Sequence, residues 1–215
     1  CKVAVVSDGL VFDSETVKGQ RIKEDADYEG VRVKFVGFLE RSRIPMQIDI
    51  GFGDIIHPKP KIIDYPVILD LPKPHFKGYP PESVVSEKFE AMMKLGLLNS
   101  RMKDFYDIWL LMRKFDFSGT ILTEALRKTL DHRKTELPQK RPLFAQEIYD
   151  NKSDRQTLWM AFLRKNDINN APDKLSAIAK TIDKFLIKPL GAIKKGKGFN
   201  ETWKAAGKWE IKPTS

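Results

Sequence analysis

The chain has 215 residues, of which 41% are hydrophobic and 31% are charged, and its formal net charge at pH 7 is +9. This composition is typical of a globular protein with one large or two small domains. No apolar run is long enough to cross a membrane, and the single cysteine, Cys1, excludes an internal disulfide. A reducing compartment is expected from this cysteine usage, so we predict a cytoplasmic protein.

The excess of basic residues lies in the C-terminal third of the chain. Residues 1–151 contain 24 basic and 23 acidic side chains, whereas residues 152–215 contain 14 and 6. Such a basic region is suited to docking a polyanion, because contacts with phosphates drive this kind of binding. A solvated basic face without a partner explains the charge equally well.

Short apolar runs broken by glycine and proline predict strands in the first 71 residues. Val31, Val33 and Phe35 alternate with Arg32 and Lys34, which is the period of a half-buried strand. We expect the strands on either side of residues 41–43 to form an antiparallel pair. Strands are expected over 3–6, 31–36, 44–50 and 67–69, and the proline-rich residues 58–81 are expected to form an extended connector.

From residue 82 onward the apolar residues recur with a helical period. Pro81 suits the first turn of a helix. The tail after residue 190 is rich in lysine and glycine but contains Phe199, Trp203 and Trp209, so we expect it to pack against the helices. Helices are expected over 82–96, 100–114, 118–134, 153–166 and 173–189.

These patterns predict the α+β class with three regions. Residues 1–81 form part of a mixed or antiparallel sheet domain with its connector. Residues 82–190 form a helical domain, and residues 191–215 form a basic aromatic tail.

Asp49 is the first candidate site residue, because it lies between Ile48 and Ile50 in an apolar strand. A buried carboxylate is costly unless a cation meets it, and Mg²⁺ prefers such hard oxygen ligands. The glycines at 51 and 53 would allow a ligand to approach closely where the strand ends. The alternative is an edge strand that leaves Asp49 in water.

The second candidate site combines Lys88 with the charged start of the next helix. Lys103 and Asp107 are an i, i+4 pair, and Asp104 lies beside apolar residues. Antiparallel packing of the two helices would bring Lys88 near Asp104 or Asp107. The alternative is an ion pair that only fixes how the two helices pack.

The segments 47–54, 84–92 and 101–110, which include the pattern Lys88…Arg101-x-Lys103-Asp104-x-x-Asp107, resemble the AbiEii/AbiGii family of nucleotidyltransferase toxins. The resemblance implies a domain like that of DNA polymerase β, followed by a helical C-terminal domain. It also implies Mg²⁺ as the cofactor and a nucleoside triphosphate as the donor. Members of the family act in bacterial abortive-infection and toxin–antitoxin systems, so a cognate antitoxin is an expected partner, and some transfer nucleotides to tRNA.

The family motifs transfer to this chain residue by residue. Asp49 matches the third carboxylate of the fold, and it would bind the metal or accept the proton of the attacking hydroxyl. Lys88 matches the motif lysine, and Asp104 and Asp107 match the later acidic motif.

The upstream Gly-Ser turn and Asp-x-Asp metal pair of the family have no match in this sequence. We therefore expect them to precede Cys1, which makes this chain an N-terminally incomplete member. Asp25 and Asp27 are a possible substitute, but they lack the Gly-Ser turn and fit a solvated turn better.

The resemblance therefore implies a metal-dependent nucleotidyltransferase toxin that acts on an acceptor such as tRNA. Phosphoryl transfer depends on positioning and charge neutralisation, so Lys88, Arg101 and Lys103 are expected to bind the triphosphate. The acceptor is expected to bind the lysines that recur every four residues, at Lys180, Lys184 and Lys188. Two alternatives remain open: an acceptor site on the β-domain face that carries Arg32, Lys34, Arg41 and Arg43, or a catalytically incomplete module that binds nucleic acid or an antitoxin.

Overall fold

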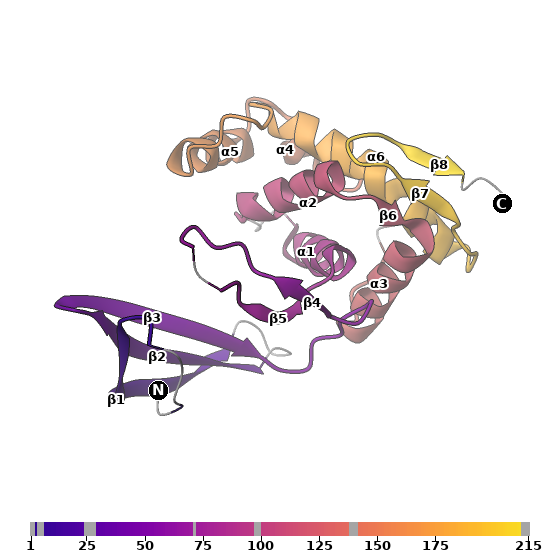
Figure 1. The fold of residues 1–215 in the computed structure, drawn as a ribbon. Coiled ribbons are helices and arrows are strands. Elements are labelled where there is room, and N and C mark those ends of the chain that lie inside the picture. Colours follow the sequence, from indigo (N-terminus) through magenta and orange to yellow (C-terminus); the bar gives the residue numbers. More distant parts are fainter. Residues whose placement is uncertain are drawn as a thin grey trace. The chain divides into compact units, whose positions relative to one another are not determined.

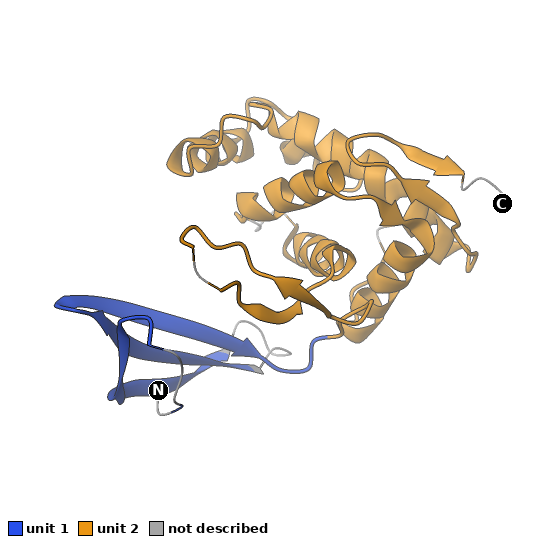
Figure 2. Ribbon diagram, in the orientation of Figure 1, with its two compact units in different colours: residues 1–54 blue, residues 55–215 orange. Residues whose placement is uncertain are grey.

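The computed structural model describes residue 3 and residues 7–23, 29–70, 72–96, 100–137 and 142–211. The chain divides into two compact units, unit 1 with residues 1–54 and unit 2 with residues 55–215 (Figure 2). The predicted α+β class is confirmed, with antiparallel sheets followed by a largely helical region (Figure 1). Among the described residues, none of the helices has the length and apolar character needed to span a membrane.

Unit 1 contains one antiparallel sheet in the order β1-β2-β3 (Figure 1). Strands β2 and β3 form the predicted antiparallel pair, and the two-residue turn at Glu40 and Arg41 connects them. Val36 is the single buried apolar side chain in the described part of this unit. The strands span Leu10–Lys23 (β1), Glu29–Leu39 (β2) and Ser42–Gly51 (β3).

Strand β1 was not expected from the sequence. Its pairing with β2 shifts register between Asp13 and Lys18, so its side chains do not alternate regularly between the two faces. The strand expected over 3–6 falls largely on residues 4–6, which lie outside the described residues.

The connector expected to be extended contains a two-stranded hairpin and belongs to unit 2. Its strands are β4 (Lys61–Asp64) and β5 (His75–Gly78). The strand expected over 67–69 is wrong, because residues 65–70 contain no strand. Two hydrogen bonds attach the residue before the connector, His57, to Ser83 in the first helix. The His57 backbone N–H donates to the Ser83 hydroxyl at 2.9 Å, and the hydroxyl donates to the His57 carbonyl at 2.9 Å.

The helices of unit 2 follow the predicted order closely. The first begins at Pro81, which needs no N–H partner in the first turn. One short helix, α4, was not expected, and the last helix continues past its predicted end. The helices span Pro81–Leu95 (α1), Met102–Lys114 (α2), Gly119–His132 (α3), Gln146–Tyr149 (α4), Asp154–Lys165 (α5) and Leu175–Lys194 (α6).

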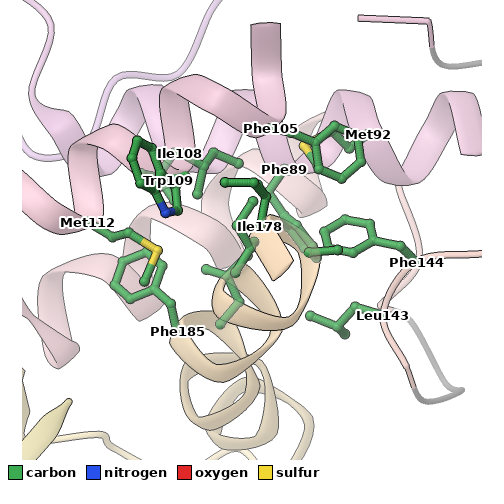
Figure 3. Packing of buried hydrophobic residues seen from close by; sticks show 14 of the residues in the cluster. Phe89, Met92, Phe105, Ile108, Trp109, Met112, Leu143, Phe144, Ile178 and Phe185 are labelled. Atoms are coloured by element: carbon green, nitrogen blue, oxygen red, sulfur yellow. The ribbon is translucent and has the colours of Figure 1, made fainter. Parts of the chain in front are cut away.

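Helix α6 lies at the centre of unit 2, where it packs against α2, α3, α4 and α5. Figure 3 shows Phe89 of α1, Ile108 of α2 and Ile178 of α6 together in the hydrophobic core. All three side chains are fully buried. This core fixes α1 against α2, the two helices that carry the charged motif.

The predicted packing of the tail is confirmed. Strands β6 (Phe117–Ser118), β7 (Glu201–Trp203) and β8 (Trp209–Ile211) form a three-stranded sheet. The Trp203 indole N–H donates to the Met112 carbonyl, near the end of α2, at 2.7 Å. A carbonyl at this position has no partner within its own helix, so the tail provides one.

Trp209 explains why α6 passes through Pro189. A proline inside a helix has no N–H for the carbonyl four residues earlier, which here is that of Phe185. The Trp209 indole N–H donates to this carbonyl at 2.8 Å. The expected helix end at residue 189 was therefore wrong because a side chain from the tail replaces the missing backbone donor.

Candidate active site

The charged residues of α1 and α2 meet near the start of α2. Lys88 Nζ lies 2.8 Å from Asp104 Oδ1 and 2.8 Å from Asp107 Oδ2. Residues 104 and 107 lie three apart and so share one face of the helix, while Lys88 reaches that face from the middle of α1. The predicted pairing is confirmed, and it involves both carboxylates.

This pairing is largely shielded from solvent. The exposed fraction of the side chain is 19% for Lys88, 1% for Asp104 and 18% for Asp107. Burial by itself lowers the pKa of Lys88, but the hydrogen bonds to Asp104 and Asp107 outweigh it, so that the pKa lies above its ordinary value. Lys88 is therefore a permanent cation at neutral pH and does not act as a general base.

Two further cations lie outside this pair of carboxylates. Arg101 Nε lies 3.0 Å from Asp104 Oδ2, and Lys103 Nζ lies 2.6 Å from Asp107 Oδ2. Their side chains are 56% and 69% exposed. We use the name Lys88 cluster for the five residues Lys88, Arg101, Lys103, Asp104 and Asp107. Its three cations and two carboxylates give a net charge of +1. The inner lysine holds the carboxylates in place, and the outer cations face solvent, where they can meet an anionic ligand such as a phosphate.

Asp49 lies in unit 1, whereas the Lys88 cluster lies in unit 2. Strand β3 is at an edge of the sheet, and the Asp49 side chain is 44% exposed. Arg32 binds both of its carboxylate oxygens, Nε donating to Oδ1 and Nη2 to Oδ2, each at 2.8 Å. These hydrogen bonds from Arg32 hold the pKa of Asp49 below its ordinary value.

The metal expected from the motif can be tested against these contacts. Across the part of the chain that the structure describes, no three His, Cys, Asp or Glu side chains gather in a way that could hold a metal ion. Mg²⁺ takes several oxygen ligands, but Asp49 contributes one carboxylate, and Arg32 already occupies it. The described residues alone therefore do not fit a divalent metal. Asp25 and Asp27 lie outside the described residues.

The three lysines expected to bind an acceptor share the exposed face of α6. Lys180, Lys184 and Lys188 are all exposed. Lys188 Nζ lies 2.5 Å from Glu201 Oε2 on β7, so part of its charge is neutralised. Of the three, Lys180 and Lys184 make no ion pair with any described residue.

The sequence analysis missed the partner of Asp49, although a signal for it was present. Leu39 pairs with Ser42 across the two-residue turn, and counting back along both strands pairs Arg32 with Asp49. Directly opposed residues of opposite charge on one face commonly form an ion pair. The alternation in residues 31–36 predicts this pair once the turn is placed at residues 40 and 41, where the structure has it, and not at the expected residues 41–43.

The comparisons with known proteins identify the family of the chain. A family model described as the nucleotidyl transferase AbiEii toxin of type IV toxin–antitoxin systems matches residues 2–186. No curated protein and no solved structure matched the chain. The family match spans Asp49, the whole Lys88 cluster, Lys180 and Lys184, while Lys188 lies beyond it. The chain therefore belongs to the AbiEii family of nucleotidyltransferase toxins.

Proposed function

We propose that the protein is an Mg²⁺-dependent cytoplasmic toxin that transfers a nucleotide from a nucleoside triphosphate to an acceptor RNA such as tRNA. Membership of the AbiEii family supports the nucleotidyltransferase chemistry, with a nucleoside triphosphate donor, a divalent metal and an antitoxin partner. The Lys88 cluster is the observation that carries the proposal. Its cations are held by one buried and one partly buried carboxylate, and a reaction that depends on positioning requires such fixed charges.

In the proposed reaction, a hydroxyl oxygen of the acceptor attacks the α-phosphorus of the donor. A new phosphorus–oxygen bond forms, the bond between the α-phosphorus and the bridging oxygen of the β-phosphate breaks, pyrophosphate leaves, and the proton of the attacking hydroxyl passes to water. Negative charge grows on the departing pyrophosphate, so fixed cations nearby lower the barrier. We assign Lys88, Arg101 and Lys103 to binding the triphosphate, and Asp104 and Asp107 to orienting these three cations.

Asp49 is the residue that we assign to the metal. When bound, Mg²⁺ would supply further neutralisation of phosphate charge. The carboxylate must first leave Arg32, and the metal needs oxygen ligands in addition to those of the described residues. The steps above use only the chain's own cations and do not depend on this assignment.

The acceptor is assigned to the exposed lysines of α6. Lys180 and Lys184 are spaced one helical turn apart and keep their charge available for phosphates. Lys188 would have to exchange Glu201 for a phosphate, so we expect it to contribute less than the other two.

The test is a transfer assay with purified protein, tRNA and each radiolabelled nucleoside triphosphate in turn. We expect label in the RNA with at least one donor, and no label with Lys88→Ala. Lys103→Ala should raise KM for the nucleotide more than it lowers kcat, because Lys103 is exposed and contacts the ground-state ligand. Lys114→Ala is the matched control, since this lysine is exposed at the end of the same helix.

A catalytically incomplete module that binds nucleic acid or antitoxin is the second candidate. The hydrogen bonds from Arg32 to both oxygens of Asp49 favour this second candidate, because they occupy the one carboxylate that we assign to the metal. Failure of every donor to label RNA, in a preparation that still binds RNA or antitoxin, would replace the proposed enzyme by this module.

A further inference from the structure

The two faces of the sheet in unit 1 differ in polarity. The register of the three strands places two rows of residues side by side on one face: Lys18, Lys34 and Gln47 in one row, and Gln20, Arg32 and Asp49 in the next. We call these six residues the polar face. Arg32 is partly exposed, and the other five are exposed. The residues that alternate with them, such as Val33 and Ile48, belong to the opposite face.

The polar face contains a pair of like charges directly opposite each other. Lys18 on β1 and Lys34 on β2 are cross-strand partners. Like charges in this arrangement destabilise a sheet. Neither lysine makes an ion pair with any other residue that the structure describes, in contrast to Arg32, which Asp49 neutralises. Lys34 interacts with the charge of Asp49 at longer range, but neither lysine has a direct ion-pair partner among the described residues.

The form of this surface indicates the kind of anion that it can bind. The lysines lie on an open sheet, beside the side-chain amides of Gln20, which can also donate hydrogen bonds, and of Gln47, whose Nε2 donates to Asp49. A small anion usually needs an enclosing set of donors, whereas a polynucleotide backbone presents phosphates over an extended open surface. None of the six side chains is aromatic, so stacking on bases plays no part in this contact.

We propose that the polar face of unit 1 binds the phosphate backbone of an RNA strand through Lys18 and Lys34. The choice of RNA rests on the proposed function, which requires a polynucleotide acceptor. The contact itself rests on the unpaired lysines and does not require nucleotide transfer. It is sequence-independent, because phosphates carry no information about the bases.

Lys18→Glu separates this proposal from a merely solvated face. It turns a like-charged pair into an oppositely charged one, so the melting temperature should rise. Affinity for a fluorescent single-stranded RNA should fall at the same time. A variant that is more stable than the wild type and binds RNA with the same affinity would overturn the proposal.

The double variant Lys18→Glu/Lys34→Glu measures the size of the contact. We expect about tenfold weaker binding of RNA, and a salt dependence whose log–log slope is smaller by about 1.4 because two phosphate contacts are lost. The matched control is Lys61→Glu/Lys77→Glu on β4 and β5, which changes the net charge equally at two exposed strand lysines. Equal losses in both double variants would mean that net charge alone drives binding, and the polar face would have no special role.

The transfer assay distinguishes this proposal from the proposed function. Loss of RNA binding in Lys18→Glu/Lys34→Glu, in a protein that transfers no nucleotide even as wild type, would support the polar face and reject the enzyme. Normal transfer together with unchanged RNA binding in the double variant would reject the polar face and keep the enzyme.

Discussion

Two of the carboxylates that the sequence offered as candidate site residues, Asp104 and Asp49, make cation contacts of the same length but lie in very different surroundings. Lys88 Nζ and Asp104 Oδ1 are 2.8 Å apart, and so are Arg32 Nε and Asp49 Oδ1. The exposed fraction of the carboxylate side chain is 1% for Asp104 and 44% for Asp49. Screening by water makes an exposed pair weak, whereas breaking a buried pair leaves a charge without compensation. The burial of the carboxylate, and not the length of the contact, therefore determines which of the two ion pairs is the more costly to break.

The same difference separates the units that contain them. The Lys88 cluster adjoins a continuous core that includes Phe89 and Phe105, both nearly inaccessible to solvent. In the described part of unit 1, Val36 is the only buried apolar side chain. A fixed network of charges needs a well-packed support, which unit 2 provides for Lys88.

The largest expected effect follows from removing Lys88. Lys88→Ala leaves the carboxylate of Asp104 buried with only Arg101 beside it, and should lower the free energy of unfolding by about 3 kcal/mol. Urea denaturation followed by tryptophan fluorescence would measure this loss. A change below about 0.5 kcal/mol, the range of ordinary surface substitutions, would contradict the importance of burial.

The double variant Lys88→Ala/Asp104→Asn serves as the control for this prediction. Neutralising Asp104 removes the uncompensated charge, so much of the lost stability should return. Nucleotide transfer should not return, because a residue that binds the triphosphate is still missing. Recovery of both properties would reduce Lys88 to a structural role.

An intermediate effect is expected where the tail replaces a backbone donor. Trp209→Phe removes the indole N–H and leaves the Phe185 carbonyl without its partner, at a cost of about 1–3 kcal/mol. In a Pro189→Ala background, the alanine N–H can bind that carbonyl, so the same substitution should cost less. A double-mutant cycle measured by thermal unfolding gives the coupling.

Trp109→Phe is the matched control for this cycle, because Trp109 is buried in the same unit and its indole N–H binds no described residue. Its cost should be the same with proline or alanine at position 189. If the cost of Trp209→Phe is also the same in both backgrounds, Trp209 does not act by replacing the backbone N–H that Pro189 lacks.

The smallest effect on stability is expected at the exposed pair. Arg32→Ala should change the melting temperature little at neutral pH, but it should raise the pKa of Asp49 toward its ordinary value of 3.8. The depressed pKa means that the ion pair stabilises unit 1 above pH 3.8, and that this contribution is lost as the pH falls through the lower pKa of the folded state. An NMR titration of the Asp49 carboxyl carbon tests both statements.

Arg43→Ala provides the comparison for the titration, since Arg43 is exposed on the same sheet and should leave Asp49 unaffected. An Asp49 pKa that is already ordinary in the wild type would show that the Arg32 contact is absent in solution.

Local patterns predicted the features that depend on neighbours in sequence. The helical period was enough to place Lys88 opposite Asp104 and Asp107, because both helices have one clear apolar face. The strands β2 and β3 were predicted from alternation and from the turn between them. Strand β1 was missed because its register shift between Asp13 and Lys18 interrupts that alternation.

Features that depend on distant residues could not be predicted in this way. Proline normally ends a helix, so residue 189 was the natural limit for α6. The donor that allows the helix to continue comes from Trp209, and no local pattern indicates it. The burial of Asp104 compared with the exposure of Asp49 likewise depends on the packing around them, which a single strand or helix pattern does not contain.

The absence of a backbone N–H at Pro189 has a consequence for the order in which unit 2 folds. Residues of α6 before Phe185 can form helical hydrogen bonds from local contacts alone. The turn that contains Pro189 is completed only when Trp209, 24 residues after Phe185, reaches it, and contacts between distant residues form at a higher entropic cost than local ones. The end of α6 is therefore a late-forming part of the fold, and the length of this helix is set by a long-range contact.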